Sequence, residues 1–512
     1  MKHGMMWLLV SCVVATAPAG AAPQDRSLTP TLIEKIRADW HLDPHARAMR
    51  NALTGTDIKG IAENRDILAD HNNKFSHKIK TKGISNQKSS GRCWMFAGFN
   101  TIKPAVLNKL DLGEFEFSQI YLQFWDKMEK ANAFLEYMIE FRRRDLMDRD
   151  VVFLLRNPAS DGGYWENFAD LVAKHGVIPK EAMAETASSE STRMMNRALA
   201  RILRKDAAEL RQIYKDTGSV KKMRQAKRKM LAQVYRVLVL NLGEPPTEFT
   251  WRHKVKDNGD EDDDEEADEP DENGDDDENG DEEDQEDEAE EDDEDQEDED
   301  AADDYDVEQD WSEPRIFTPQ SFYREFVGLD LSEYVNIADD PIRPKGGHYE
   351  VDLTRNLWDG RNTHYANVDI QRLREIVIDV LLANKPVYFA ANVSPDQDSS
   401  KGIMARNLYD YESVYDIEMD LNKTERLLLR DGTINHGMAF IGVDLRDGAP
   451  VKWLVENSWG SSRGRGGLWT MYDDWFEDHV YKVVVHRDFV PDKILEALDK
   501  PAVKLPVWDP MW

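Results

Sequence analysis

Cysteine is almost absent from this chain. Among 512 residues there are 2 cysteines, and one of them, Cys12, lies in an apolar N-terminal segment with the pattern of a cleaved export signal. Removal of that segment leaves Cys93 alone, which excludes an intrachain disulfide and any fold held together by disulfides. We therefore expect stabilisation by the core or by assembly. An unpaired thiol outside the cytosol oxidises unless it is buried or used.

Long hydrophobic runs are absent as well. The longest, residues 5–14, is too short to span a bilayer, and Ala19-Gly20-Ala21 follows it as an A-x-A cleavage pattern. We predict a signal peptide over residues 1–21, hence an exported protein, periplasmic or secreted, with no transmembrane segment. One alternative is an uncleaved apolar tail on a cytosolic protein. Another is lipid attachment at Cys12 in Leu9-Val10-Ser11-Cys12, which the continuation of the apolar run past Cys12 disfavours.

Basic residues are missing from residues 257–310, which hold 38 of the 100 Asp and Glu residues. The rest of the chain has 62 acidic and 65 basic residues, so the net charge of −35 describes this segment and not a folded part. Like-charge repulsion and scarce apolar residues prevent a packed core there, and we predict a disordered acidic insertion. Residues 193–236 have the opposite bias, with 14 Lys and Arg against 3 acidic residues.

The remaining sequence predicts a mixture of helices and strands. Helices are expected over residues 28–69, 92–103 (ending at Pro104), 115–140 and 191–241 (with Gly218 between two halves). Strands are expected over residues 384–392, 437–443, 451–456 and 467–472, a turn at Asp161-Gly162-Gly163, and an extended tail over residues 506–512.

The chemistry is indicated by Cys93, in Asn86-Gln87-Lys88-Ser89-Ser90-Gly91-Arg92-Cys93-Trp94-Met95-Phe96. The expected helix places the thiol at its N-terminus, where the helix dipole stabilises a thiolate and lowers the thiol pKa. Gln87, six residues earlier, supplies an amide donor for the oxyanion that a thiolate attack on a carbonyl creates.

A nucleophilic cysteine needs a histidine held by a third group. His436 and His348 are both candidates, but only His436 has an orienting residue in a matching context, Asn457 in Glu456-Asn457-Ser458-Trp459-Gly460. Trp459 could exclude water from the His–Asn bond. Each residue alone also fits a structural role, as a core thiol, a histidine before a strand or a turn asparagine. The combination with Gln87 favours catalysis.

These residues resemble the papain-like cysteine peptidases, and within them the bleomycin hydrolase / aminopeptidase C family. Gln-x-x-Ser-Gly-Arg-Cys-Trp is similar to that family's form of the motif, in which Ser90 stands where ordinary papain-like enzymes have a disulfide cysteine. Similar motifs cover most of the mature chain apart from the acidic insertion: residues 114–121, 124–127, 157–163, 243–251, 407–410, 455–460 and 506–511.

The resemblance implies an α+β papain-like cysteine proteinase fold with helical insertions and a C-terminal arm that reaches the active site. It also implies the roles of the site residues. Cys93 is the nucleophile, His436 the general base and acid, Asn457 the orienter of His436, and Gln87 with the Cys93 backbone N–H the oxyanion hole. Gly162 and Gly163 match the strip that pairs with the substrate backbone, where glycine allows close approach. No metal and no cofactor are implied.

The family resemblance further implies a homohexamer and an arm that blocks the cleft beyond the first substrate residue, which makes the enzyme an aminopeptidase. Here the chain departs from the pattern, because its arm stops at Trp512. The shorter arm could leave the cleft open to endopeptidase substrates, or the bulky Trp512 could fill the gap, and we count Trp459 and Trp512 with the glycines as substrate-contacting candidates. The export signal and the acidic insertion are two further departures.

We expect a thiol-dependent aminopeptidase that acts on peptides. The alternatives are a cysteine endopeptidase and a non-catalytic nucleic-acid- or peptide-binding protein, against which the set of Cys93, His436, Asn457 and Gln87 argues. The basic stretch could bind nucleic acid, but we expect the acidic insertion to mask it in the intact protein; a solvated spacer is the alternative role. The expected division is a signal peptide (1–21), an N-terminal extension with the Cys93 lobe and basic helices (22–256), the insertion (257–310), the remaining core with His436 and Asn457 (311–505) and the arm (506–512).

Overall fold

A computed structural model describes residues 27–255 and 311–512 of the chain. The predicted signal peptide with Cys12 and the predicted acidic insertion lie outside these residues. The described residues divide into two compact units. The smaller contains residues 27–65 and 409–419, and the larger contains residues 66–255, 311–408 and 420–512.

The smaller unit is helical, with α1 (Pro30–Asp39), α2 (Pro44–Leu53), α3 (Ile58–Ala62) and α14 (Tyr411–Tyr415). Thr29 and Asp43 cap α1 and α2 by accepting hydrogen bonds from backbone N–H groups, and a proline follows each cap. The helices expected over residues 28–69 are confirmed. No pattern in the sequence predicts that residues 409–419 return to them, as Asp410 does by donating its backbone N–H to the Ala62 carbonyl at 2.8 Å.

A large mixed sheet forms the centre of the larger unit, in the order β14-β5-β6-β4-β13-β7-β10-β11-β12-β9-β8, with β1 paired to β10. Its strands are β1 (His77–Lys78), β4 (Tyr334–Ala338), β5 (His348–Val351), β6 (His364–Asn367), β7 (Val387–Ala391), β8 (Gln397–Asp398), β9 (Ile403–Met404), β10 (His436–Arg446), β11 (Ala449–Glu456), β12 (Leu468–Tyr472), β13 (Val480–His486) and β14 (Val503–Leu505). The four predicted strands are confirmed as β7, β10, β11 and β12. The central strands are buried on both faces, as their apolar runs require.

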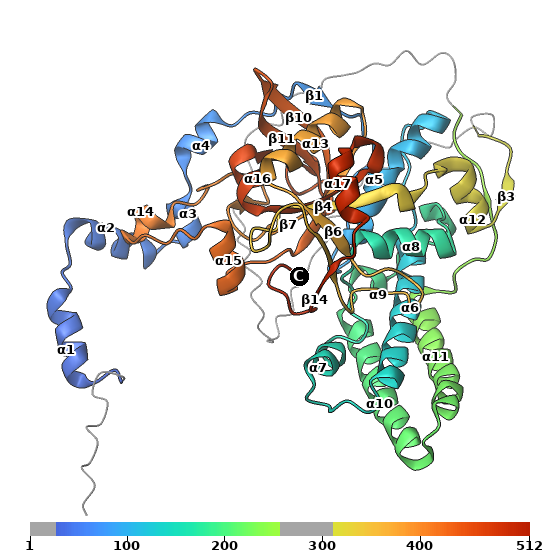
Figure 1. Cartoon of the computed structure of the whole chain (residues 1–512). Helices are drawn as coiled ribbons and strands as arrows, with labels where there is room; N and C mark the ends of the chain where they lie inside the picture. Colours follow the sequence, from blue (N-terminus) through green and yellow to red (C-terminus); the bar gives the residue numbers. More distant parts are fainter. Residues whose placement is uncertain (1–26, 256–310) are drawn as a thin grey trace, which may run out of the picture. The chain divides into compact units, whose positions relative to one another are not determined.

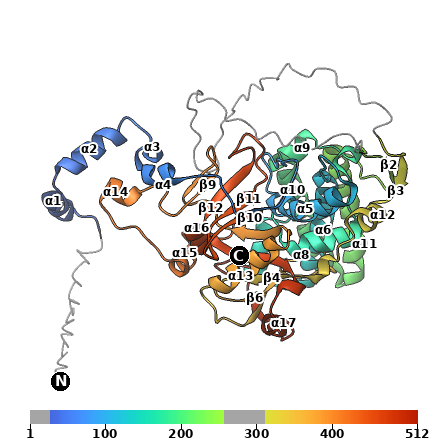
Figure 2. The ribbon, with the colours of Figure 1, turned by 90° about the horizontal axis from the view of Figure 1, so that it is seen from above.

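Helices pack beside this sheet, and Figure 2 shows α5 and α8 on one side of β10 and β11. The helices are α4 (Arg65–Asp70), α5 (Cys93–Leu110), α6 (Gln119–Glu140), α7 (Arg149–Arg156), α8 (Trp165–His175), α9 (Ala187–Glu190), α10 (Arg193–Thr217), α11 (Val220–Leu242), α12 (Pro319–Phe322), α13 (Ile370–Leu382), α15 (Lys423–Leu429), α16 (Asp473–His479) and α17 (Asp492–Leu498). None of the helices in the described ranges combines the length and the apolar character needed to cross a bilayer.

The helix that begins at Cys93 is longer than predicted. The expectation that it ends at Pro104 is wrong, because α5 continues to Leu110 with Pro104 inside it. A proline in a helix interior costs about 3 kcal/mol. Residues 94–104 and 106–107 of α5 are buried, and burial of so much surface on both sides of Pro104 outweighs that cost.

The long basic stretch forms the antiparallel pair α10 and α11, which shares a hydrophobic core with α6 and α7 (Figure 1). The predicted break is confirmed at Gly218, whose φ of +62° ends α10. Beyond α11, β2 (Phe249–Trp251) pairs with β3 (Arg315–Phe317), so the described segments that end at residue 255 and begin at residue 311 are joined by one small sheet.

The C-terminal arm is folded rather than extended, so that expectation is wrong. After β14, which pairs with β5, two turns are closed by the backbone N–H groups of Asp509 and Trp512, which donate to Pro506 and Asp509 at 3.0 and 3.1 Å. Met511 is fully buried, and the Asp509 carboxylate pairs with Arg343. These contacts fix the last residue in place.

Candidate active site

Cys93 is the first residue of α5 and is partly exposed. The backbone of α5 thus points its free N–H groups towards the thiol. The residue on the other side of the site is His436, the first residue of β10, which is buried. The packing of α5 against β10 brings these two residues together from positions more than 340 residues apart.

Asn457 directly follows β11 and orients His436. The antiparallel pairing of β10 with β11 places Ala439 opposite Glu456, which brings His436 beside the residues after β11. His436 Nε2 lies 2.8 Å from Asn457 Oδ1. Because that oxygen only accepts, the imidazole carries a proton on Nε2 and leaves Nδ1 for the thiol. The Trp459 ring lies 4.8 Å from the His436 ring and covers this bond.

Cys93 and His436 shift each other's pKa in the directions that favour a thiolate and an imidazolium. Burial alone would raise the thiol pKa, but the charge of His436 and its hydrogen bond, with backbone hydrogen bonds from Gly437 and Trp94, lower the pKa of Cys93 below its usual value. Burial would lower the imidazole pKa, but the thiolate and Asn457 raise the pKa of His436. A thiolate beside an imidazolium is the reactive form of such a pair.

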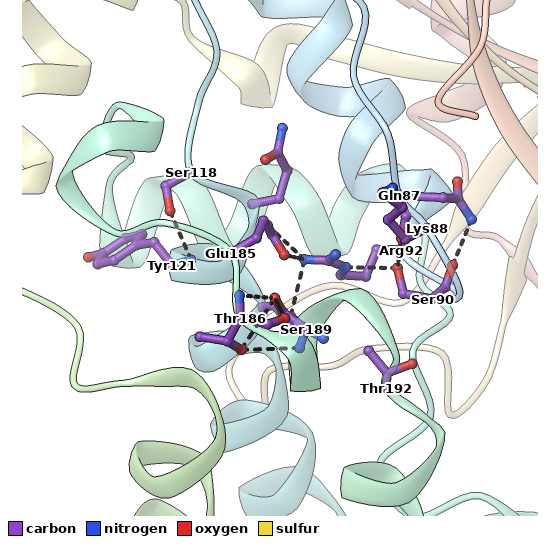
Figure 3. A network of polar contacts seen from close by, with 12 residues as sticks. Gln87, Lys88, Ser90, Arg92, Ser118, Tyr121, Glu185, Thr186, Ser189 and Thr192 are labelled. Atoms are coloured by element: carbon purple, nitrogen blue, oxygen red, sulfur yellow. Dashed lines mark hydrogen bonds and ion pairs between the residues drawn. The ribbon is translucent and has the colours of Figure 1, made fainter. Parts of the chain in front are cut away.

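Gln87 lies in the loop before α5 and is buried. Its Nε2 donates to the Ser90 carbonyl at 2.6 Å (Figure 3). Its Oε1 accepts from the Ser458 hydroxyl at 2.7 Å. The Gln87 backbone N–H also donates to the Ser458 carbonyl. These bonds join the Cys93 loop to the Asn457 loop and use one of the two N–H groups of the Gln87 amide.

Ser90 and Arg92 hold this loop from the other side (Figure 3). The Ser90 hydroxyl donates to the Gln87 carbonyl and accepts from Arg92 Nε at 2.9 Å. Arg92, 1% exposed, pairs with Glu185 at 2.9 Å and donates to Gln123. Ser90 stands where ordinary papain-like enzymes have a disulfide cysteine. Here polar and ionic contacts hold the loop at this position.

Asp161 joins the predicted glycine strip to the rest of the site, and the sequence did not single it out. Its carboxylate pairs with Lys127 at 2.6 Å and accepts hydrogen bonds from the Gly91 backbone and from Thr192 and Asn196 at the start of α10. Burial would raise its pKa, but Lys127 and these donors lower the pKa of Asp161 well below its usual value. Its carbonyl accepts from the Trp94 indole at 2.7 Å.

A cavity of about 440 Å³ opens at the reacting pair. It is lined by Cys93, His436, Gly162 and Gly163, together with Tyr164, Lys130, Arg355, Lys482 and the arm residue Val507. Trp512 packs against Tyr164, with ring centroids 5.6 Å apart. The other histidine candidate, His348, instead lies on β5 with Nδ1 2.7 Å from the Lys500 carbonyl and does not line this cavity.

A buried ion pair also connects the nucleophile helix to the histidine side. Lys103 of α5 pairs with Glu456, the residue before Asn457, at 2.8 Å, and donates to the Gly83 carbonyl. Both side chains are buried. The pair fixes α5 relative to β11, and so Cys93 relative to Asn457.

The chain is similar to several known proteins. The profile of the Peptidase C1-like family matches residues 27–266 and 301–512. Aminopeptidase C of Streptococcus thermophilus is 32% identical over 95% of this chain and 98% of its own, and bleomycin hydrolase of Homo sapiens is 32% identical over 94% and 96%. The crystal structure of PepW from Lactobacillus rhamnosis superposes with a TM-score of 0.81 at 32% identity, covering 95% of this chain and 99% of that one.

Proposed function

The chain belongs to the Peptidase C1-like family, and on that premise we propose that it is a cysteine aminopeptidase in which Cys93 is the nucleophile. Its relatives named Aminopeptidase C and bleomycin hydrolase support the activity. The observation that carries the assignment of residues is the thiol–imidazole pair with His436 Nε2 held 2.8 Å from Asn457 Oδ1.

The reaction follows from the protonation of this pair. The Cys93 thiolate attacks the carbonyl carbon of the first peptide bond, and the oxyanion is stabilised by the Cys93 backbone N–H and by Gln87. His436 gives its Nδ1 proton to the departing amine, which leaves the N-terminal residue as a thioester on Cys93. His436 then takes a proton from water, whose oxygen displaces the thiolate and releases the amino acid.

The position of the arm favours an aminopeptidase over an endopeptidase. Val507 lines the cavity, and Trp512 packs on Tyr164, the residue after the glycine strip. A substrate chain that extended upstream of its first residue would meet this arm.

Export and assembly into a homohexamer complete the proposal. The A-x-A pattern before Ala22 supports export to the periplasm or beyond. For assembly, Leu32 and Ile36 of α1 are exposed, as are Leu28 before the helix and Trp40 directly after it, and these apolar side chains suit a protein partner. Mass measurement by light scattering at several concentrations tests assembly, and a stable monomer at all of them would contradict it.

The activity is tested with fluorogenic amides of leucine, methionine and arginine, each with a free and with an acetylated α-amine, under reducing conditions. We expect wild type to cleave the free-amine forms and Cys93→Ala to cleave neither. Comparable cleavage of the acetylated forms would make the enzyme an endopeptidase. Absence of any Cys93-dependent cleavage would indicate a non-catalytic binding protein.

A further inference from the structure

Lys482 is a lysine in the middle of the central sheet. It lies on β13, opposite Ala338 of β4 and Ala390 of β7, and is 1% exposed. It nevertheless lines the cavity that contains Cys93 and His436. The mechanism above gives it no task.

No carboxylate of the described residues lies within ion-pair distance of the Lys482 ammonium. A buried charge without compensation is costly. Glu166 is the acidic group whose charge acts on it; Glu166 Oε1 accepts from the Asn336 amide and the His364 backbone N–H, while its Oε2 is buried without a hydrogen bond from the described residues. Burial lowers the pKa of Lys482 to about 8, and Glu166 partly offsets that shift. The side chain therefore still carries its charge at pH 7.

Two aromatic faces take the place of a carboxylate. Lys482 Nζ lies 5.2 Å from the centre of the Tyr164 ring and 4.9 Å from the centre of the Trp512 ring. Both distances are within the range of cation–π attraction, which strengthens when the cation is desolvated. Tyr164 follows the glycine strip, and Trp512 is the last residue of the arm.

The other two cations of the cavity are already engaged. Lys130 pairs with Asp126 at 2.7 Å and donates to the Ser160 and Gly162 carbonyls. Arg355 donates to the Tyr137 hydroxyl and stacks over Trp358. Lys482 is thus the cavity cation whose contacts are to the arm and to Tyr164.

We propose that Lys482 is a specificity-determining residue: its ammonium holds the Trp512 ring against Tyr164, keeps the arm over the cleft and thereby restricts the enzyme to substrates with a free N-terminus. The inference rests on the proposed aminopeptidase activity. Lys482 acts through Trp512 and not on the reacting atoms. The contact with the Trp512 ring thus holds the arm to the central sheet.

The test compares cleavage of leucine amidomethylcoumarin with that of its N-acetyl form at pH 7. Lys482→Met keeps the length of the side chain and removes its charge. We expect the ratio of acetylated to free-amine kcat/KM to rise about 3- to 30-fold, the range of a desolvated cation–π contact. Trp512→Ala should raise the ratio similarly, and Trp512→Phe, which keeps a ring, should raise it less.

Lys385→Met is the matched control. Lys385 Nζ lies 5.1 Å from the centre of the Phe489 ring, a contact of the same kind on an exposed side chain that does not line the cavity. This variant should leave the ratio unchanged. The double variant Lys482→Met with Trp512→Ala should exceed neither single variant, because both remove the same restraint.

Three results would overturn the inference while leaving the aminopeptidase intact. One is an unchanged ratio in Lys482→Met, with a melting temperature equal to that of wild type. Another is an equal fall in both activities, which would indicate a merely structural lysine. The last is a selective loss of cleavage of substrates that begin with an acidic residue, with the ratio of acetylated to free-amine kcat/KM unchanged. That result would show that Lys482 binds the carboxylate of such a substrate. Failure of wild type to cleave either substrate would instead contradict the proposed function itself.

Discussion

At the scale of single residues, the site depends on hydrogen bonds with Gly437, Trp94 and Asn457. These bonds shift the pKa values of the Cys93 thiol and the His436 imidazole. The thiol pKa is lowered and the imidazole pKa is raised, and both shifts favour the thiolate–imidazolium form of the pair. The kcat/KM profile should therefore be bell-shaped, with an acidic limb from thiolate protonation and an alkaline limb from loss of the imidazolium proton. Both limbs belong to the coupled pair.

Asn457→Ala should move the alkaline limb to lower pH. The Asn457 hydrogen bond raises the pKa of His436, so its removal lets the imidazolium deprotonate earlier. We expect kcat/KM to fall by roughly 10²-fold as well, at the lower end of what general acid–base catalysis contributes. The measurement is kcat/KM across pH. An alkaline limb that stays in place would show that Asn457 does not act on the imidazole.

Gln87→Glu should lower kcat with little change in KM. The substitution keeps the size of the side chain, but a carboxylate cannot donate to an oxyanion. Loss of one oxyanion donor costs about 10²- to 10³-fold in kcat. Gln87 Nε2 also donates to Ser90, so the melting temperature is measured in parallel. If the melting temperature falls while kcat stays unchanged, Gln87 stabilises the loop and takes no part in catalysis.

At the scale of elements, the site is fixed by contacts between segments that touch the first turn of α5. The glycine strip lies against Trp94, and a Cβ on Gly163 would approach that ring to 2.6 Å. A Cβ on Gly162 would meet no atom within 4 Å. Gly162 therefore has room for a Cβ, whereas Gly163 does not.

Gly163→Ala should therefore be harmful and Gly162→Ala, its matched control, much less so. Overpacking against Trp94 should lower the free energy of unfolding by about 1–3 kcal/mol, and a displaced strip should lower kcat/KM by up to about 10²-fold. Chemical denaturation and peptide kinetics measure the two effects. Equal effects of the two variants would contradict the conclusion that Gly163 is needed for close packing against Trp94.

Asp161→Asn should destabilise the protein at the contact of the glycine strip with α6 and α10. The pKa of Asp161 is lowered in the fold, so its carboxylate stabilises the protein above the ordinary pKa of an aspartate and loses this effect as pH falls below that value. Breaking such a buried pair costs about 3–5 kcal/mol. The difference in unfolding free energy between wild type and variant should thus shrink below about pH 4, whereas the exposed Asp499→Asn should show no such difference.

At the scale of the whole molecule, the described segments before and after the acidic insertion lie next to each other, so a short linker can replace the insertion. The Ser312 backbone N–H donates to the His253 carbonyl at 2.8 Å, and Lys254 bridges to Trp311, so the ends of the described segments meet. Several basic residues nearby are engaged within the fold: Arg204 and Arg211 donate to carbonyls, and Lys227 pairs with Glu136. Lys205 and Arg224 of these helices also form ion pairs, with Asp206 and Glu136, whereas the described residues hold no carboxylate partner for Arg228, Lys229 and Arg236.

Replacing residues 257–310 by a short Gly-Ser linker should leave peptide cleavage and the melting temperature near those of wild type. It should also let the protein retard DNA at low salt, because clustered Lys and Arg attract phosphate once the acidic segment is gone. Gel retardation at several salt concentrations measures this gain. If the shortened protein binds no more DNA than the intact one, the insertion is a solvated spacer rather than a mask.

The sequence by itself determined what lies within one segment: the thiol at a helix start, the histidine before a strand, the asparagine in its turn, and most helices and strands. These follow from local patterns, because capping, periodicity and motif spacing act over a few residues. It failed at Pro104, where burial in the tertiary fold outweighs a local breaker. It also failed at the tail, where contacts with Arg343 and the core impose turns.

Only the tertiary structure decided which distant residues meet. Asp161 with Thr192, Lys103 with Glu456, and Lys482 with Trp512 come from segments whose sequences carry no mark of their partners. The return of residues 409–419 to the N-terminal helices is of the same kind. Such pairs depend on strand register and helix packing across the whole chain, and these are set by the summed burial of many side chains rather than by any local pattern.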